Sequence, residues 1–156
     1  MTFVVRSCAT ACAILLIVRG VSYPLLALSL TQTAKTVEPS RVVWEGVYTN
    51  KQAKRGELQY QQQCATCHGA SLVGGEASPP LAGDQFLEAW DGRSLGELFE
   101  TIQVTMPADS PGRLSTQQCA DIVAFVLSSN GFPAGDNEIG REAALLKEIP
   151  IRRSKP

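Results

Sequence analysis

The segment "CATCH" (64–68) places two thiols and the only histidine of the 156-residue chain within five residues. Cysteine and histidine side chains can hold a zinc ion, form a redox-active dithiol or a disulfide, or attach a haem covalently. Each of these chemistries requires something different from the rest of the chain. The other residues therefore decide which chemistry the segment supports.

Three of the four chemistries fit the rest of the sequence poorly. Downstream of residue 30, Cys119 is the one cysteine outside the segment, whereas a structural zinc site uses four protein ligands. A thioredoxin-like dithiol is expected on a scaffold of alternating strands and helices, and the sequence shows no strand pattern. A disulfide between Cys64 and Cys67 leaves His68 without a role, although it remains the main alternative.

Covalent haem attachment accounts for all three side chains. Cys-x-x-Cys-His is the signature of c-type haem attachment. The two thiols add to the two vinyl groups of the haem, and the adjoining histidine then reaches the iron from one face. We therefore expect one covalently attached haem c, with thioether bonds at Cys64 and Cys67 and with His68 as an iron ligand.

The second axial ligand of the iron cannot be another histidine, because His68 is the only one. The chain has two methionines, Met1 and Met106, and Met1 would be lost with a signal peptide. Met106 lies in the segment "QVTMPAD", where a loop methionine followed by proline is poorly placed to fill a core. We expect Met106 to ligate the iron opposite His68, which would raise the reduction potential.

Residues 1–30 have the pattern of a secretory signal peptide. Arg6 precedes an apolar run over 9–18, and small residues over 27–29 offer a cleavage region without a sharply defined site. We expect export to the periplasm, where c-type haem is attached, and no membrane span after cleavage. An uncleaved membrane anchor is the alternative, although the apolar run is shorter than the about 20 residues that span a bilayer.

The charge balance argues against nucleic-acid binding. Without residues 1–30 the chain carries 12 Lys and Arg against 15 Asp and Glu, so nothing would neutralise a run of phosphates. Aromatic residues make up 6% of the chain, which predicts a small core to which a bound cofactor could contribute apolar volume.

The chain divides into a central domain with two extensions. We expect residues 31–46 to be a linker or an N-terminal arm, 47–133 to form the domain, and 134–156 to be a flexible C-terminal tail. Apolar periodicity and helix-ending residues predict helices within the domain over 50–64, 94–104 and 115–133. Segments rich in glycine and proline separate them, so the expected fold class is all-α.

Three motifs in order, "CATCH" (64–68), "SPPLAG" (78–83) and "TMP" (105–107), resemble those of the class I c-type cytochromes with one haem. The resemblance covers about 47–133 and implies the cytochrome c fold, in which three to five short helices surround one covalent haem. Three longer runs are similar to bacterial cytochromes c associated with quinoprotein (pyrroloquinoline-quinone) dehydrogenases: "VWEGVYTNKQAKRGELQYQQQCATCHG", "FLEAWDGRSLGELF" and "MPADSPGRLS".

The resemblance implies roles for three more residues. The carbonyl of Pro79 would accept the ring N–H of His68, and Leu81 would press on the haem face. Trp90 would donate its indole N–H to a haem propionate, with simple core packing as the alternative. Gly56 on the first helix would allow a close crossing of the last helix. Cys119 departs from the family pattern, since it has no partner cysteine; we expect it to be a buried small hydrophobe, and a link between two copies of the chain is the alternative.

The resemblance further implies a protein that transfers single electrons between redox partner proteins and has no catalytic residues of its own. A quinoprotein dehydrogenase would be the donor, and an oxidase or another cytochrome would be the acceptor. A fixed cytochrome subunit of a dehydrogenase complex is one alternative. A haem enzyme or a gas-binding module is another, if Met106 does not ligate the iron. The sequence leaves the oligomeric state open.

Overall fold

The computed structural model describes residues 41–76 and 78–156. The expected signal peptide, 1–30, and the first part of the expected arm, 31–40, lie outside the described residues. Among the described residues, no helix has both the length and the apolar character needed to cross a bilayer.

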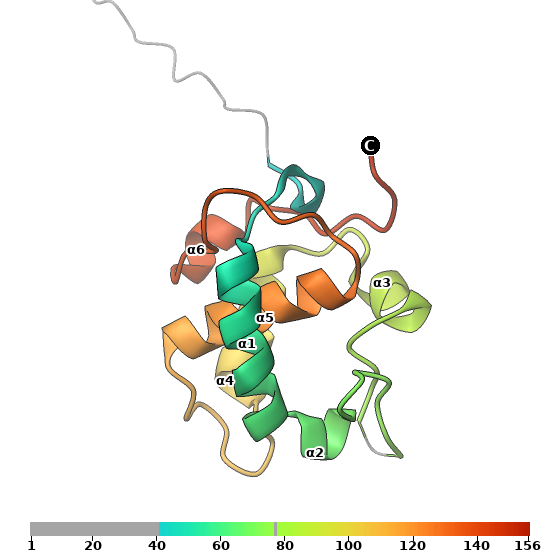
Figure 1. The fold of residues 1–156 in the computed structure, drawn as a ribbon, viewed down its shortest axis with the longest axis vertical. Helices are drawn as coiled ribbons and strands as arrows, with labels where there is room; N and C mark the ends of the chain where they lie inside the picture. The colour runs from blue at the N-terminus through green and yellow to red at the C-terminus, as the bar shows by residue number, and fades with distance from the viewer. Residues whose placement is uncertain (1–40, 77) are drawn as a thin grey trace, which may run out of the picture. The chain divides into compact units, whose positions relative to one another are not determined.

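The described residues form helices and a single isolated antiparallel bridge, between Ser94 and Pro150. This confirms the all-α fold class (Figure 1). In chain order the elements are the 3₁₀ helix η1 (Val43–Glu45), then α1 (Asn50–Gln63), α2 (Ala65–His68), α3 (Asp84–Trp90), α4 (Leu95–Thr105), α5 (Thr116–Ser129) and α6 (Ala143–Leu146).

Side chains at the helix starts explain where the three longest helices begin. The hydroxyl of Thr49 accepts a hydrogen bond from the backbone N–H of Gln52 at the start of α1. Helices α4 and α5 each begin with a capping box, in which a serine and a residue three positions later bond each other's backbone N–H groups. These pairs satisfy N–H groups that the first turn leaves without partners.

Helices α1 and α5 cross in close contact, as Figure 1 shows. A Cβ atom added at Gly56 would lie 1.8 Å from the backbone oxygen of Asp121, so only glycine allows this approach. The rings of Tyr60 and Phe125 lie 5.2 Å apart beside the crossing. Cys119 on α5 is fully buried. The predicted packing of Gly56 and of Cys119 is thereby confirmed.

The prediction of a flexible C-terminal tail over 134–156 is wrong. Ile139, Leu146 and Ile151 of this segment are buried in the core. The backbone N–H of Ile151 donates to the carbonyl of Arg93 at 2.8 Å, which joins the segment to the start of α4. The segment is held because it adds apolar side chains to a core that has few aromatic residues.

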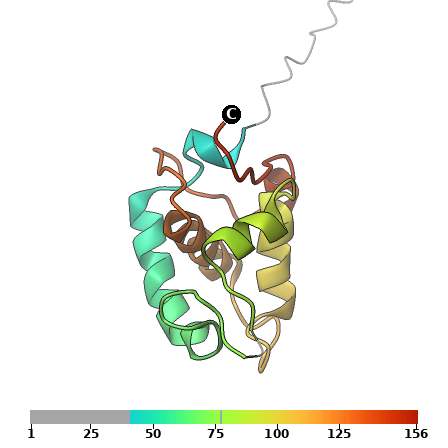
Figure 2. The same cartoon turned by 90° about the vertical axis from the view of Figure 1, so that its right-hand side faces the viewer.

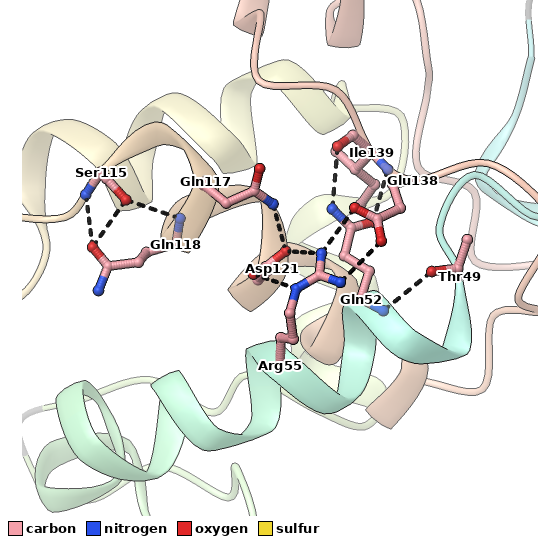
Figure 3. A network of polar contacts seen from close by, with 9 residues as sticks. All are labelled: Thr49, Gln52, Arg55, Ser115, Gln117, Gln118, Asp121, Glu138 and Ile139. Carbon is pink, nitrogen blue, oxygen red and sulfur yellow. Dashed lines mark hydrogen bonds and ion pairs between the residues drawn. The ribbon is translucent and has the colours of Figure 1, made fainter.

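A polar network also holds this segment against α1 and α5 (Figure 3). The guanidinium of Arg55 donates to both oxygens of Asp121 and to both of Glu138, at distances from 2.8 to 3.0 Å. Hydrogen bonding to Arg55 holds the pKa of Glu138 below its usual range. Asp121 and Glu138 lie 66 and 83 residues from Arg55 in sequence, so no local sequence pattern predicts these ion pairs.

The described part of the N-terminal arm packs in the same way. Val43 is fully buried, and the indole N–H of Trp44 donates to the carbonyl of Arg152 at 2.8 Å. Residues 41–46 are therefore an arm that lies against the domain.

Shortening Ile151 to alanine should lower the free energy of unfolding by about 2–5 kcal/mol, because it leaves a cavity where a fully buried side chain stood. Leu145 on α6 is 66% exposed, so Leu145→Ala should change stability by less than about 0.5 kcal/mol. Chemical denaturation of the two holoprotein variants measures both values. Equal effects would contradict a packed C-terminal segment.

Candidate functional site

The "CATCH" motif forms a single turn of helix directly after α1. The backbone N–H of Cys64 donates to the carbonyl of Tyr60 at 2.8 Å, and that of His68 donates to the carbonyl of Cys64 at 2.9 Å. Residues three positions apart share one side of a helical turn. Cys64 and Cys67 therefore lie on the same side of the turn, as two attachments to one edge of a planar group require.

The ring of His68 is oriented by one hydrogen bond. Its Nδ1 atom lies 2.8 Å from the carbonyl oxygen of Pro79. A carbonyl only accepts hydrogen bonds, so Nδ1 carries a proton. In the neutral imidazole Nε2 then keeps a free lone pair, which is the form that binds a metal. The predicted contact between His68 and Pro79 is present, and it leaves His68 ready to act as an axial ligand.

Backbone hydrogen bonds fold the loop between α2 and α3 back over the motif. The N–H of Gly74 donates to the carbonyl of His68 at 2.9 Å, and the N–H of Leu81 donates to the carbonyl of Leu72 at 2.8 Å. The hydroxyl of Tyr60 donates to the carbonyl of Gly69 at 2.6 Å. These bonds bring Pro79, 11 residues after His68, within reach of its ring.

Asn130, the residue that ends α5, is a further contact of this loop. Its Nδ2 atom donates to the carbonyl of Leu81 at 2.9 Å, and its Oδ1 atom accepts the N–H of Gly83 at 3.0 Å. Because an asparagine before a glycine is already explained by the end of a helix, the sequence carries no signal for this second role.

The three described cysteines are free thiols. Burial raises the pKa of Cys64 to about 11, and neighbouring Cys119 adds to the effect. Burial also raises the pKa of Cys119 to about 11. Zinc binds thiolates, and no group of three or more His, Cys, Asp and Glu side chains placed for a metal ion occurs among the described residues. The site therefore does not resemble a zinc site.

Met106 follows the last residue of α4 and is half-buried, with its N–H bonded to the carbonyl of Ile102 at 3.1 Å. Both views place the end of α4 at the same end of the molecule as α2 (Figures 1 and 2). A hydrogen bond from Arg113 to Gln63 joins the loop after Met106 to the end of α1. The chain thus brings the segments of His68 and Met106 to one end of the fold.

Leu81 and Trp90 are both half-buried and pack against the core. The ring of Trp90 lies 6.1 Å from that of Phe86, and the guanidinium of Arg93 sits 3.9 Å above its face. These contacts support core packing of Trp90. No described contact joins its indole N–H to the motif, so the bond to a propionate stays a prediction.

The donor set fits a haem. The porphyrin supplies four nitrogen ligands itself, so the protein has to add only axial ligands and attachment points. Two thiols on one side of a turn, an imidazole with its Nε2 free and a thioether at the same end of the fold meet that need. Half-buried apolar side chains, such as Leu81 and Ile102, are suited to contact the porphyrin.

Comparison with known proteins agrees with this chemistry. Residues 51–126, which contain the motif and Met106, match the sequence family described as "Cytochrome C oxidase, cbb3-type, subunit III". The chain is 28% identical to the "Cbb3-type cytochrome c oxidase subunit CcoP" of Azospirillum sp. (strain B510), over 60% of this chain and 36% of that protein. The chain thus spans about a third of that relative.

A similar solved structure is the crystal structure of the sulfane dehydrogenase SoxCD from Paracoccus pantotrophus. It is 25% identical in sequence, with a TM-score of 0.45, over 70% of this chain and 62% of the matched chain.

Replacing Cys64 with serine should leave one haem vinyl group unreacted. The conjugation of the macrocycle then extends, and the absorption maximum of the pyridine haemochrome should move to longer wavelength. Cys119→Ser is the matched control, since burial raises the pKa of this thiol as it does that of Cys64, and it should leave the spectrum unchanged. A shift with Cys119→Ser and none with Cys64→Ser would reverse the assignment of the attachment sites.

Proposed function

Since residues 51–126 are a class I c-type cytochrome domain that serves electron transfer, we propose that this protein is an exported one-electron carrier with its iron between His68 and Met106. The cofactor of the domain is a covalently bound haem c. The observation that carries the proposal is the 2.8 Å contact between Nδ1 of His68 and the carbonyl of Pro79, because it presents Nε2 as a ligand.

The haem supplies an iron that cycles between the ferric and ferrous states. The chain's own residues hold it in place: Cys64 and Cys67 tether one edge, and the bond from His68 to Pro79 fixes the imidazole and raises its basicity. The thioether of Met106 would be a soft neutral ligand, which would favour ferrous iron and raise the reduction potential. Because His68 and Met106 would both hold the iron, the protein would leave no iron position for a substrate, and the fixed residues would move little.

Enzymatic or gas-binding activity would need an iron position that Met106 does not fill. His68 is the only histidine of the chain. If it ligates the iron, no imidazole remains for acid–base catalysis. The proposal therefore places the protein among electron carriers rather than haem enzymes.

The partners in this proposal are redox proteins. The quinoprotein dehydrogenase expected as donor receives no support from the comparisons, which name a cbb3-type oxidase subunit and a sulfane dehydrogenase. Because the first of these is a subunit, a fixed place in a larger complex is the second candidate. Gentle extraction followed by co-purification distinguishes these two hypotheses. A free carrier elutes alone, whereas a fixed subunit elutes with its complex.

The proposal of export rests on the signal pattern of residues 1–30 and on the compartment in which c-type haem is attached, the periplasm. The mature protein in this proposal is periplasmic and lacks residues 1–30. Intact mass of the mature protein reports N-terminal processing and the added haem together, and a full-length mass would favour the membrane-anchored alternative.

Replacing Met106 with alanine should abolish the weak far-red band of sulfur-to-iron ligation in the ferric spectrum. It should also lower the reduction potential, because the ligand that favours ferrous iron is lost. Val104→Ala is a suitable control, since Val104 lies two residues earlier and is 65% exposed. An unchanged far-red band in Met106→Ala would contradict the proposed ligation.

The end of the molecule around the motif carries few charges, and one of them is the exposed guanidinium of Arg113 beside Gln63. Of the residue types Asp, Glu, Lys and Arg, residues 58–83 contain only Glu76, and residues 101–112 contain only Asp109. Exposed valines occur in both segments: Val73 is 70% exposed and Val104 is 65% exposed. Contacts through such a surface depend little on ionic strength.

Electron self-exchange between two copies of the protein tests this directly. NMR line broadening should give a rate that changes little between low and physiological ionic strength. Val73→Lys should slow self-exchange several-fold at low ionic strength, because two like charges then face each other. Leu145→Lys adds the same charge at a 66% exposed site on α6, away from the motif (Figures 1 and 2), and should have a much smaller effect. Equal slowing by both variants would show that net charge alone is responsible.

A further inference from the structure

We propose that Asn130 is a positioning residue for His68: by clamping the loop that carries the Pro79 carbonyl, it sets the hydrogen bond that tunes the iron ligand. The inference rests on the proposed ligation of iron by His68. Asn130 lies at the opposite end of the domain sequence from the motif, 62 residues after His68, and has no place in the ligand set described above.

The side chain of Asn130 uses both of its polar atoms. Nδ2 donates to the carbonyls of Leu81 and Val126, at 2.9 and 2.8 Å, and Oδ1 accepts the N–H of Gly83 at 3.0 Å. A flipped amide would set its donors against the N–H of Gly83 and its oxygen against two carbonyls. The orientation is therefore determined by the partners.

The clamp acts close to the carbonyl that orients His68. Only Pro80 separates Pro79 from Leu81, and the rings of both prolines restrict rotation about their N–Cα bonds. The N–H of Leu81 is also bonded to the carbonyl of Leu72 at 2.8 Å. A displacement of the Leu81 carbonyl is therefore transmitted to the Pro79 carbonyl with little chance of being absorbed between them.

Both sides of the His68–Pro79 bond are thereby anchored to the same pair of helices. The motif continues directly from the end of α1, and Asn130 ends α5, which crosses α1 at Gly56. No other side-chain hydrogen bond among the described residues joins α5 to the backbone of residues 79–83. Together with the backbone bonds of Leu81 and Ala82 to Leu72, the clamp therefore sets the distance between the imidazole and its acceptor.

Gln52 provides a matched comparison at a distant place. It is a buried amide that also bonds a backbone twice: its Nε2 donates to the carbonyl of Ile139 at 3.1 Å, and its Oε1 accepts the N–H of Ile139 at 2.7 Å. These bonds hold the C-terminal segment (Figure 3) and have no contact with the motif. Loss of either clamp should destabilise the fold, but only loss of Asn130 should affect the ligand.

The expected direction follows from the chemistry of imidazole. A strong hydrogen bond from Nδ1 makes the imidazole more basic and favours ferric iron. Loss of the clamp weakens that bond, so the reduction potential should rise. The Nδ1 proton should also exchange with solvent faster, by several-fold for a weakened bond and by about tenfold for a lost one.

The experiment compares holoprotein carrying Asn130→Ala with holoprotein carrying Gln52→Ala. Potentiometry gives the potential, NMR gives the exchange rate of the His68 Nδ1 proton, and denaturation gives stability. We expect both variants to lose stability and only Asn130→Ala to show the raised potential and the faster exchange. Equal changes in both variants, or none in Asn130→Ala, would show that Asn130 is merely structural.

Two further measurements keep the test decisive. If Asn130→Ala does not fold, Asn130→Asp retains the acceptor for Gly83 and loses the donor to Leu81, and faster exchange of the Nδ1 proton is again expected; unchanged exchange overturns the inference. The wild-type NMR spectrum tests the premise separately. Ring protons of His68 without the shifts of an iron-bound imidazole would overturn the proposed ligation itself, whatever the variants do.

Discussion

The contact between α1 and α5 at Gly56 is the constraint on which the rest of the structure depends. A backbone oxygen occupies the space that any other side chain would need, so the two helices meet at one place along their lengths. Helix α1 continues into the motif, and α5 ends at the residue that clamps the loop opposite. The crossing therefore sets where the imidazole and its hydrogen-bond acceptor lie.

The C-terminal segment supports this crossing from outside. Arg55 on α1 bonds Asp121 on α5 and Glu138 beyond it, so one guanidinium joins three parts of the chain. A planar guanidinium is suited to this, because its fixed fork of donors matches carboxylates from two directions. Ile151 then adds apolar burial at the start of α4. The C-terminal segment is thus held by polar bonds to α1 and α5 and by apolar packing near the start of α4.

The two ends of the described fold differ in chemistry, and this fits the proposed role. The polar network and the basic C-terminal residues belong to elements away from the motif, whereas the motif end exposes valines and carries few charges, among them Arg113. A carrier needs an association that forms and ends quickly, and small contact surfaces provide it. A surface without charge pairs adds little to hold the partners once the electron has passed.

Local chemistry was readable from the sequence alone. The spacing of Cys64, Cys67 and His68 predicted the cofactor that the comparisons support, and helix periodicity predicted the all-α fold, because both signals repeat over a few residues. The packed C-terminal segment and the roles of Arg55 and Asn130 came only from the tertiary structure. The partners of the C-terminal segment and of Arg55, and the loop partners of Asn130, lie 47 to 108 residues away along the chain. A hydrogen bond between distant segments leaves no periodic pattern in either of them.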